Sequence, residues 1–182
     1  MTEEEAFERV QEGDREAFTV IVEGTRGRLV TFLAPYFRWD LSLAEEVAQR
    51  AYVRAFEKRA QYQVGRPFRP WFFRLARNLA LDELRSRKPQ VSVEEFGDIL
   101  RSGDDPARAA SQEEEVRKLV EAMESLPPVQ KEVADMVRQG FSYREIAEVL
   151  DMSEVSARNN LAHAVKKLRQ LLGVVETQGG RE

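Results

Sequence analysis

The chain has 182 residues, enough for one or two domains that each bury a core. It contains no cysteine and one histidine, which excludes disulfides and thiolate metal sites and nearly excludes a histidine-based metal cluster or catalytic triad. The formal net charge is −4, from 28 basic and 32 acidic side chains. No apolar run reaches the roughly 20 residues that span a bilayer, and the acidic amino terminus lacks a signal-peptide core. We therefore expect a cytoplasmic protein without membrane insertion.

Helical signals begin at the amino terminus. Thr2 and Glu5 form a capping box that predicts a first helix. Asp14 is placed to cap a second helix, and a third is expected over about 26–37.

A fourth and a fifth helix follow. Ser42 and Glu45 are expected to cap the fourth, whose apolar stripe consists of Leu43, Val47, Ala51, Ala55 and Phe56. Gly65 and Pro67 break the chain, and Pro70 suits the first turn of the fifth helix. The buried side of that helix is predicted to hold Phe72, Leu75, Ala76, Leu79 and Leu84.

The segment 89–110 has the composition of a linker. It mixes proline and glycine with acidic residues and carries few large apolar ones, which predicts a flexible acidic connection. Helical signals resume at Ser111, and a further helix is expected to begin at Pro128 and to end at Gly140.

Residues 142–169 predict a helix-turn-helix. Ser142 and Glu145 form a capping box for a short helix, and Asp151 suits the left-handed backbone of a tight turn. Ser153 can cap a second, basic helix, whose apolar positions Leu161, Val165, Leu168 and Leu172 recur at helical spacing. This motif places its second helix in a DNA major groove, although helical hairpins also occur as mere packing units.

The predicted fold is therefore all-α, with two small helical domains joined by a flexible acidic linker. The expected boundaries are 1–88 for the first domain, 89–110 for the linker, 111–173 for the second domain and 174–182 for a disordered tail.

The charge distribution is more informative than the net charge. Residues 26–88 carry fourteen basic side chains and six acidic ones, and no acidic residue lies between Val155 and Val175. Because local potential governs contact with phosphates, two basic surfaces fit a nucleic-acid-binding protein. Ordinary solvated helix faces would explain either surface alone.

Three segments carry a resemblance to a known family. LPPVQKEVADMVRQGFSYREIAEVLDMS, residues 126–153, resembles the promoter-binding C-terminal region of bacterial sigma factors. FRPWFFRLARNLALDELRSRK, residues 68–88, resembles their conserved second region, and LAEEVAQRAYVRAF, residues 43–56, resembles the helix by which that region docks on polymerase. Two such units with only a short linker between them are the layout of the extracytoplasmic-function sigma factors of the sigma-70 family.

The resemblance implies a non-catalytic transcription initiation factor with neither cofactor nor metal. Its partners would be RNA polymerase core, promoter DNA as duplex and as melted strand, and an anti-sigma factor. The implied minus-35 contacts are Ser153, Ser156, Arg158, Asn159, Asn160, His163, Lys166 and Lys167. The implied minus-ten contacts are Tyr62, Arg66, Phe68, Arg69, Arg74, Arg77, Asn78, Arg85, Arg87 and Lys88. Polymerase docking falls on Glu46, Gln49, Arg50 and Arg54.

Plainer interpretations remain for several of these residues. Trp71 and Phe72 fit a core better than a base-stacking site, and His163 could be a packing histidine. For the whole chain, the alternative is a regulator that binds duplex DNA without joining the polymerase, which leaves the basic aromatic segment 59–88 unexplained. A protein-binding helical adaptor and an enzyme fit the residues less well.

Overall fold

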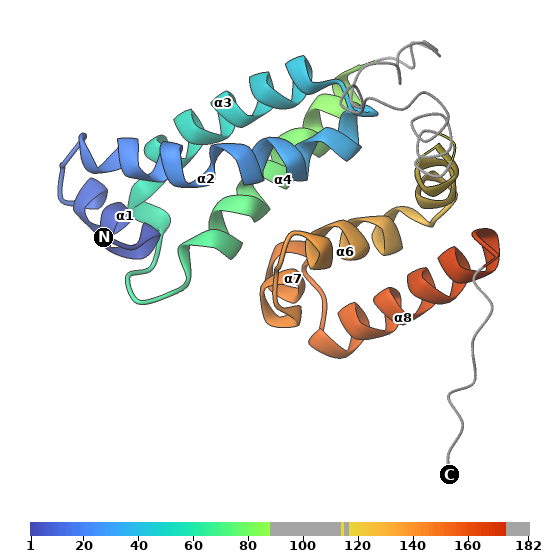
Figure 1. Cartoon of the computed structure of the whole chain (residues 1–182). Helices are drawn as coiled ribbons and strands as arrows, with labels where there is room; N and C mark the ends of the chain where they lie inside the picture. The colour runs from blue at the N-terminus through green and yellow to red at the C-terminus, as the bar shows by residue number, and fades with distance from the viewer. Residues whose placement is uncertain (88–113, 115–116, 174–182) are drawn as a thin grey trace, which may run out of the picture.

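The computed structural model describes residues 1–87, 114 and 117–173. All regular secondary structure within these ranges is helical, which confirms the all-α prediction (Figure 1). Across the same ranges, none of the helices combines the length and the apolar character needed to cross a bilayer. The predicted linker, the predicted tail, Lys88 and the Ser111 cap all lie outside the described residues.

The first helix forms as its local sequence predicts. α1 spans Glu3–Gln11, and Thr2 Oγ1 accepts a hydrogen bond from the Glu5 N–H at 3.2 Å. The Glu5 carboxylate accepts one from the Thr2 N–H at 2.9 Å, which completes the capping box. Phe7 lies on the inner face of α1 and is fully buried.

The predicted second and third helices are one continuous helix, so the predicted break near residue 26 is wrong. α2 spans Ala17–Leu33 and is followed by the short 3-10 helix η1, Ala34–Phe37. Ile21, Thr25 and Leu29 recur at helical spacing and are all buried. This shared buried face holds the helix together despite the low helix propensity of its two glycines.

The next two helices complete the first unit. α3 spans Leu41–Glu57, and its cap is Asp40 rather than Ser42, because the Asp40 carboxylate accepts from the Leu43 N–H at 3.0 Å. α4 spans Phe68–Ser86 and follows the short 3-10 helix η2, Arg59–Gln61. On the predicted inner face of α4, Phe72 and Ala76 are fully buried and Leu75 and Leu79 are half-buried, whereas Leu84 is 41% exposed, in contrast to the prediction.

Aromatic rings form the centre of this unit. Phe7 and Phe68 have their ring centroids 4.6 Å apart, and Phe68 stacks on Phe72 at 5.3 Å. The ring centroids of Tyr52 and Phe72 are 5.2 Å apart, and the buried hydroxyl groups of Tyr52 and Thr25 share a hydrogen bond of 2.8 Å. These contacts join α1, α2, α3 and α4 into one core.

The last three helices form a second unit. α6 spans Pro128–Arg138, α7 spans Tyr143–Leu150 and α8 spans Glu154–Leu171. Gly140 follows α6 with φ 83°, in the left-handed region, where glycine carries no Cβ penalty. α8 packs on both α6 and α7.

The two units are in contact. Figure 1 shows α7 below the first half of α4, and the two helices pack together. Phe141 lies between α6 and α7. The centroid of its ring is 5.0 Å from that of Phe73 on α4 and 6.4 Å from that of Phe32 on α2. The hydrophobic core therefore continues from one unit into the other.

Candidate nucleic-acid interface

Local hydrogen bonds fix the turn between α7 and α8. Ser142 and Glu145 form the predicted capping box at the start of α7, and Asp151 has φ 56° at its end. Ser153 Oγ accepts from the Ser156 N–H at 3.0 Å and caps α8 as predicted. The direction in which α8 leaves the turn is thus set by residues close together in sequence.

α8 has a narrow inner face and a polar outer face. Ala157 and Ala164 are fully buried, and α8 packs on both α6 and α7. The predicted apolar stripe is therefore only partly buried: Leu161, Val165 and Leu168 are half-buried and Leu172 is 37% exposed. The outer face presents the exposed side chains of Arg158, Asn159, His163 and Lys166.

Some predicted minus-35 residues are engaged within the protein. Asn160 is half-buried, and its side-chain Nδ2 donates to the Ser156 carbonyl at 2.9 Å. Lys167 Nζ donates to the Ser125 carbonyl at 2.6 Å and so ties α8 to the end of the helical segment 117–124, which comes before α6. Ser153 uses its hydroxyl as the cap. The side chains most available to a ligand are those on the outer face.

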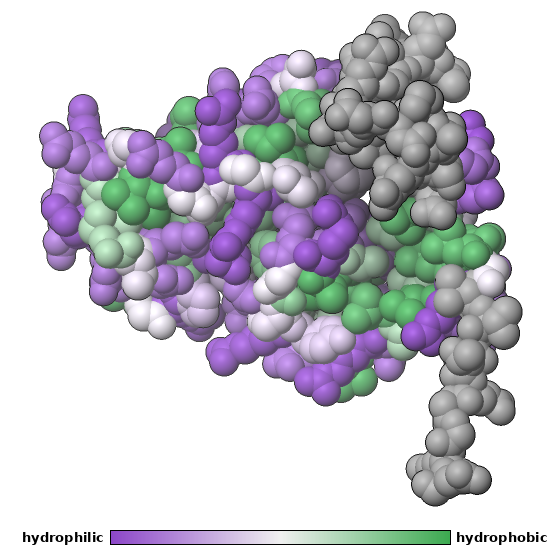
Figure 2. Space-filling model, in the orientation of Figure 1, coloured by the Kyte–Doolittle hydropathy of each residue, from purple (hydrophilic) through white to green (hydrophobic). Residues whose placement is uncertain are grey.

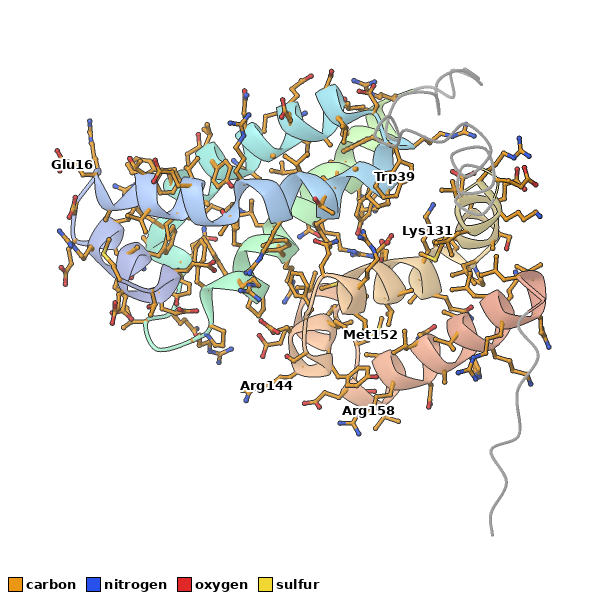
Figure 3. The ribbon with its side chains drawn as sticks, viewed as in Figure 1. Glu16, Trp39, Lys131, Arg144, Met152 and Arg158 are labelled. Carbon is orange, nitrogen blue, oxygen red and sulfur yellow. The ribbon has the colours of Figure 1, made fainter. Side chains whose placement is uncertain are left out.

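Arg158 is held by two neighbours. Its guanidinium group lies 5.1 Å from the centre of the Tyr143 ring and 4.0 Å from the Glu154 carboxylate. A groove of about 640 Å³ runs beside this contact and is lined by Tyr143, Leu161 and Val165 among others. Figure 3 shows Arg158 and Arg144 pointing outward from α8 and α7. Tyr143 was not predicted as a site residue, because nothing in its spacing indicates that it meets Arg158.

The predicted minus-ten residues fall into three groups. Five side chains are exposed on α4, on the loop before it or at its C-terminal cap: Arg66, Arg74, Asn78, Arg85 and Arg87. Arg69 and Arg77 are half-buried in ion pairs with the second unit. Tyr62 and Phe68 belong to the core, with exposed fractions of 4% and 0%.

Tyr62 and Phe68 are not accessible to a base in this conformation. The Tyr62 hydroxyl donates to the Arg66 carbonyl, which closes the loop before α4. Burial, together with Glu4 and Glu8, raises the pKa of Tyr62 to about 12. Phe68 packs among the rings at the centre of the first unit. Phe72 is also fully buried and Trp71 half-buried, in line with the core role that their sequence favours.

A cleft of about 620 Å³ lies between the loop before α4 and the turn between α7 and α8. One wall includes Arg66, Trp71 and Arg74, and the other includes Arg144 and Met152. The cleft places the edge of Trp71 among three arginines and three carboxylates, because Glu148, Asp151 and Glu154 also line it.

The outward face of α3 carries the predicted docking residues. Glu46, Gln49, Arg50 and Arg54 are all exposed. Arg50 is tied to α4 through Glu83, with Nη1 and Oε2 at 2.5 Å. Arg87 and Arg50 together lower the pKa of Glu83, so this carboxylate stays ionised between them. Among the four predicted docking residues, Arg50 therefore has its side chain bound to α4.

Exposed apolar side chains occur in both units, among them Leu41 and Val53 in the first. Figure 2 shows hydrophilic residues mixed with hydrophobic ones over the first unit, and hydrophobic residues near the start of α6 and the end of α8. The exposed apolar side chains there include Val129, Leu171 and Leu172.

Two family models match parts of the chain. The family model described as Sigma-70 region 2 matches residues 24–90, and the one described as Sigma-70, region 4 matches residues 117–168. The chain is 30% identical over 179 residues to the RNA polymerase sigma factor CarQ of Myxococcus xanthus, covering 96% of this chain and all of CarQ. It is 26% identical over 176 residues to the ECF RNA polymerase sigma-E factor of Haemophilus influenzae, covering 90% of this chain and 92% of that one.

The chain is also similar to one longer relative and to one solved structure. The probable RNA polymerase sigma factor RfaY of Xanthomonas campestris is 32% identical over 166 residues, or 88% of this chain, and the chain spans only 41% of that relative. Among solved structures, CnrH in complex with the cytosolic domain of CnrY is similar, with a TM-score of 0.70 at 23% identity. That match covers 94% of this chain and 97% of CnrH, and it supports the fold.

Proposed function

Because the chain belongs to the extracytoplasmic-function group of the sigma-70 family of RNA polymerase sigma factors, we propose that it contacts promoter DNA through two separate surfaces. The family membership makes it a non-catalytic polymerase subunit for transcription initiation. The proposed domains are region 2 over residues 1–88 and region 4 over residues 111–173. The surfaces assigned below follow from side-chain exposure and charge.

The first surface is the outer face of α8, which we assign to minus-35 duplex DNA. It presents Arg158, Asn159, His163 and Lys166 on a rigid helix. A helix of this kind fits a major groove, where arginine can pair with guanine and asparagine with adenine. Lys166 lies further along α8 than Arg158 and Asn159, the two residues suited to pair with bases, and its charge is suited to a phosphate. Beyond Glu154, α8 carries no acidic residue, and this exposed basic face is the observation on which the assignment of α8 depends.

The second surface is α4 with the loop before it, which we assign to the melted minus-ten strand. Its exposed cations, Arg66, Arg74, Arg85 and Arg87, supply contacts for phosphates. The cleft beside Trp71 offers room for an unstacked base. Unstacking costs a few kcal/mol, which aromatic stacking of ~1–3 kcal/mol per base and the phosphate contacts can offset.

The outward face of α3 is assigned to polymerase core. Glu46, Gln49 and Arg54 are exposed side chains on a helix whose other face is buried through Val47 and Ala51. Polar side chains on a rigid element are typical of the rim of a protein interface.

Two further proposals concern a protein partner and the place in the cell. CnrH is bound to the cytosolic domain of CnrY in its structure, and we propose that an anti-sigma factor likewise binds this chain. We also propose that the protein acts in the cytoplasm, where RNA polymerase works on the chromosome.

Reconstituted transcription tests these assignments. The purified chain is added to core polymerase with a library of promoter sequences, and transcripts and core binding are measured separately. Arg158→Glu is expected to abolish promoter-specific initiation while core binding is retained. Arg15→Glu, which changes an exposed arginine outside every assigned surface, is the matched control. A wild-type chain that binds core but never opens a promoter would contradict the proposal.

A further inference from the structure

The loop 62–67, which joins η2 to α4, is bound at its beginning by α1. Gln11 is the last residue of α1, and its side chain is half-buried. Its Nε2 donates to the Arg59 carbonyl at 2.5 Å and to the Tyr62 carbonyl at 2.9 Å. One side-chain amide therefore fixes the backbone where η2 passes into the loop.

The end of the same loop is bound by Glu4, near the start of α1. Its Oε1 accepts a hydrogen bond from the Phe68 N–H, the first of α4, at 3.1 Å. The N-cap position of α4 is Pro67, which makes no side-chain hydrogen bond to the helix. A carboxylate at a helix amino terminus satisfies a free N–H and is favoured by the helix dipole. Glu4 thus supplies a cap that the residue before α4 does not.

Aromatic contacts join the inner side of the loop to α1. The ring centroid of Phe7 is 5.2 Å from that of Tyr62 and 5.2 Å from that of Trp71. The Tyr62 hydroxyl donates to the Arg66 carbonyl across the loop. The inner side of the loop is therefore part of the core, and α1 also packs against the tryptophan that lines the cleft.

The tip of the loop stays open to solvent. Val64 is 65% exposed, and the side chains of Gln63 and Arg66 are exposed as well. Gly65 has φ 82°, in the left-handed region that glycine adopts without a Cβ penalty. The loop thus combines an anchored base with an accessible tip.

A loop that already has its binding conformation loses less conformational entropy when its ligand arrives, and it binds more tightly for that reason. We propose that α1 is a positioning element for capture of the melted minus-ten strand, in which Gln11 and Glu4 hold the loop 62–67 in the shape that takes up an unpaired base. Both residues act through the backbone of the loop and not by touching DNA. This inference rests on the proposed function of α4 and the loop before it.

Four variants separate the loop contacts from other effects. Gln11→Met keeps the length of the side chain and removes the donor. Glu4→Leu removes the acceptor, whereas Glu4→Gln keeps an oxygen that can accept from Phe68 and should restore wild-type behaviour. Glu12→Gln is the control, because it removes an exposed carboxylate at the C-terminal cap of the same helix. Circular dichroism and urea unfolding check that each variant is folded.

Hydrogen exchange of the full-length chain is the first measurement. Peptides that cover 59–68 should exchange faster in Gln11→Met and in Glu4→Leu than in wild type. Peptides from α2 and α3 should exchange as in wild type, and so should 59–68 in Glu4→Gln and Glu12→Gln. If neither Gln11→Met nor Glu4→Leu changes the exchange of 59–68, the proposal that α1 holds the loop is overturned.

Strand binding by the holoenzyme is the second measurement. If the released loop has the binding conformation one time in ten, the apparent Kd rises about tenfold. Fluorescence anisotropy with a labelled minus-ten non-template oligonucleotide should show this weakening for Gln11→Met and Glu4→Leu, and none for Glu4→Gln or Glu12→Gln. Loss of a negative charge by itself favours DNA binding, so weaker binding by Glu4→Leu cannot result from the charge. Binding to core and to minus-35 duplex should stay unchanged.

Oligonucleotides that lack single bases show whether the loop acts on base capture. In the wild-type holoenzyme, we expect one abasic position to weaken binding more than the others. In Gln11→Met the ratio of abasic to intact Kd at that position should fall by up to about tenfold, because capture of the base is already impaired. A general weakening of the fold would reduce the affinity for both strands equally and leave this ratio unchanged.

The outcomes distinguish this inference from the proposed function. If exchange of 59–68 rises while the affinity and the abasic ratio stay at wild-type values, the positioning role of α1 is overturned. If the wild-type holoenzyme binds every abasic strand as tightly as the intact one, the assignment of the loop to the melted strand fails. Hydrogen exchange then shows separately whether Gln11 and Glu4 hold the loop.

Discussion

The guanidinium group of Arg158 lies over the ring of Tyr143, 5.1 Å from its centre. The two residues belong to different helices of the turn motif, and the contact holds an exposed arginine in one orientation on the outer face of α8. A cation over an aromatic face at an exposed site contributes about 0.5–1 kcal/mol. Tyr143 is therefore a positioning residue for Arg158.

Tyr143→Leu is expected to weaken binding to minus-35 duplex by roughly two- to fivefold, which corresponds to that energy. Tyr143→Phe keeps the ring and should restore wild-type affinity. Fluorescence anisotropy with a promoter duplex measures both. Equal affinities for Tyr143→Leu and wild type would show that Arg158 needs no such support.

Asn160 tests the base preference expected of α8. Its amide donates to the Ser156 carbonyl, one turn back along α8. Asn160→Arg is expected to shift the minus-35 preference toward guanine at one position, because arginine pairs with guanine and is worth about 1–3 kcal/mol there. Sequencing of promoters selected from a random library measures the preference, and an unchanged preference would contradict the prediction. Asn160→Ala is the control for loss of the amide alone.

Phe68 tests whether a predicted DNA contact is a core residue instead. Its ring is fully buried among Phe7, Phe72 and Trp71. Phe68→Ala should lower the free energy of unfolding by about 3–5 kcal/mol, the range for large aromatic truncations in a core. Urea unfolding measures the change, and Phe68→Leu should cost less. A stable Phe68→Ala variant with weaker strand binding would instead favour the DNA role.

Asp135 gives a prediction with a pH dependence. It lies in the last turn of α6, is 6% exposed, and burial raises its pKa, only partly countered by Arg138 and Lys131. A carboxyl group with a pKa higher in the folded than in the unfolded state binds more protons when folded, so its contribution to stability improves as the pH falls through the raised value. A negative charge near a helix C-terminus is also unfavourable.

Asp135→Asn should therefore raise the free energy of unfolding at pH 7 by about 0.5–1 kcal/mol, the size of a helix-end charge effect. The gain should shrink as the pH is lowered through the raised pKa, where wild-type Asp135 becomes neutral as well. Urea unfolding at several pH values follows this difference. Asp82→Asn, on the exposed side of α4, is the control and should show little change.

Local signals predicted the elements of this protein well. The capping boxes of α1 and α7, the left-handed Asp151 and the Ser153 cap all form as expected. Each depends on hydrogen bonds between residues at most a few positions apart, which the order of residues alone specifies. The same locality explains the error at α2, where burial of Ile21, Thr25 and Leu29 against other helices carried the helix past two glycines.

Contacts between distant residues were decided only by the tertiary structure. The family resemblance identified Phe68 and Arg77 as site candidates, but not which partners each would meet. Phe68 is core because Phe7, far earlier in the chain, packs against it. Arg77 is covered because folding brings Glu132, 55 positions away, within hydrogen-bonding distance. A sequence specifies what a side chain can bind, whereas packing decides whether that side chain is free to bind it.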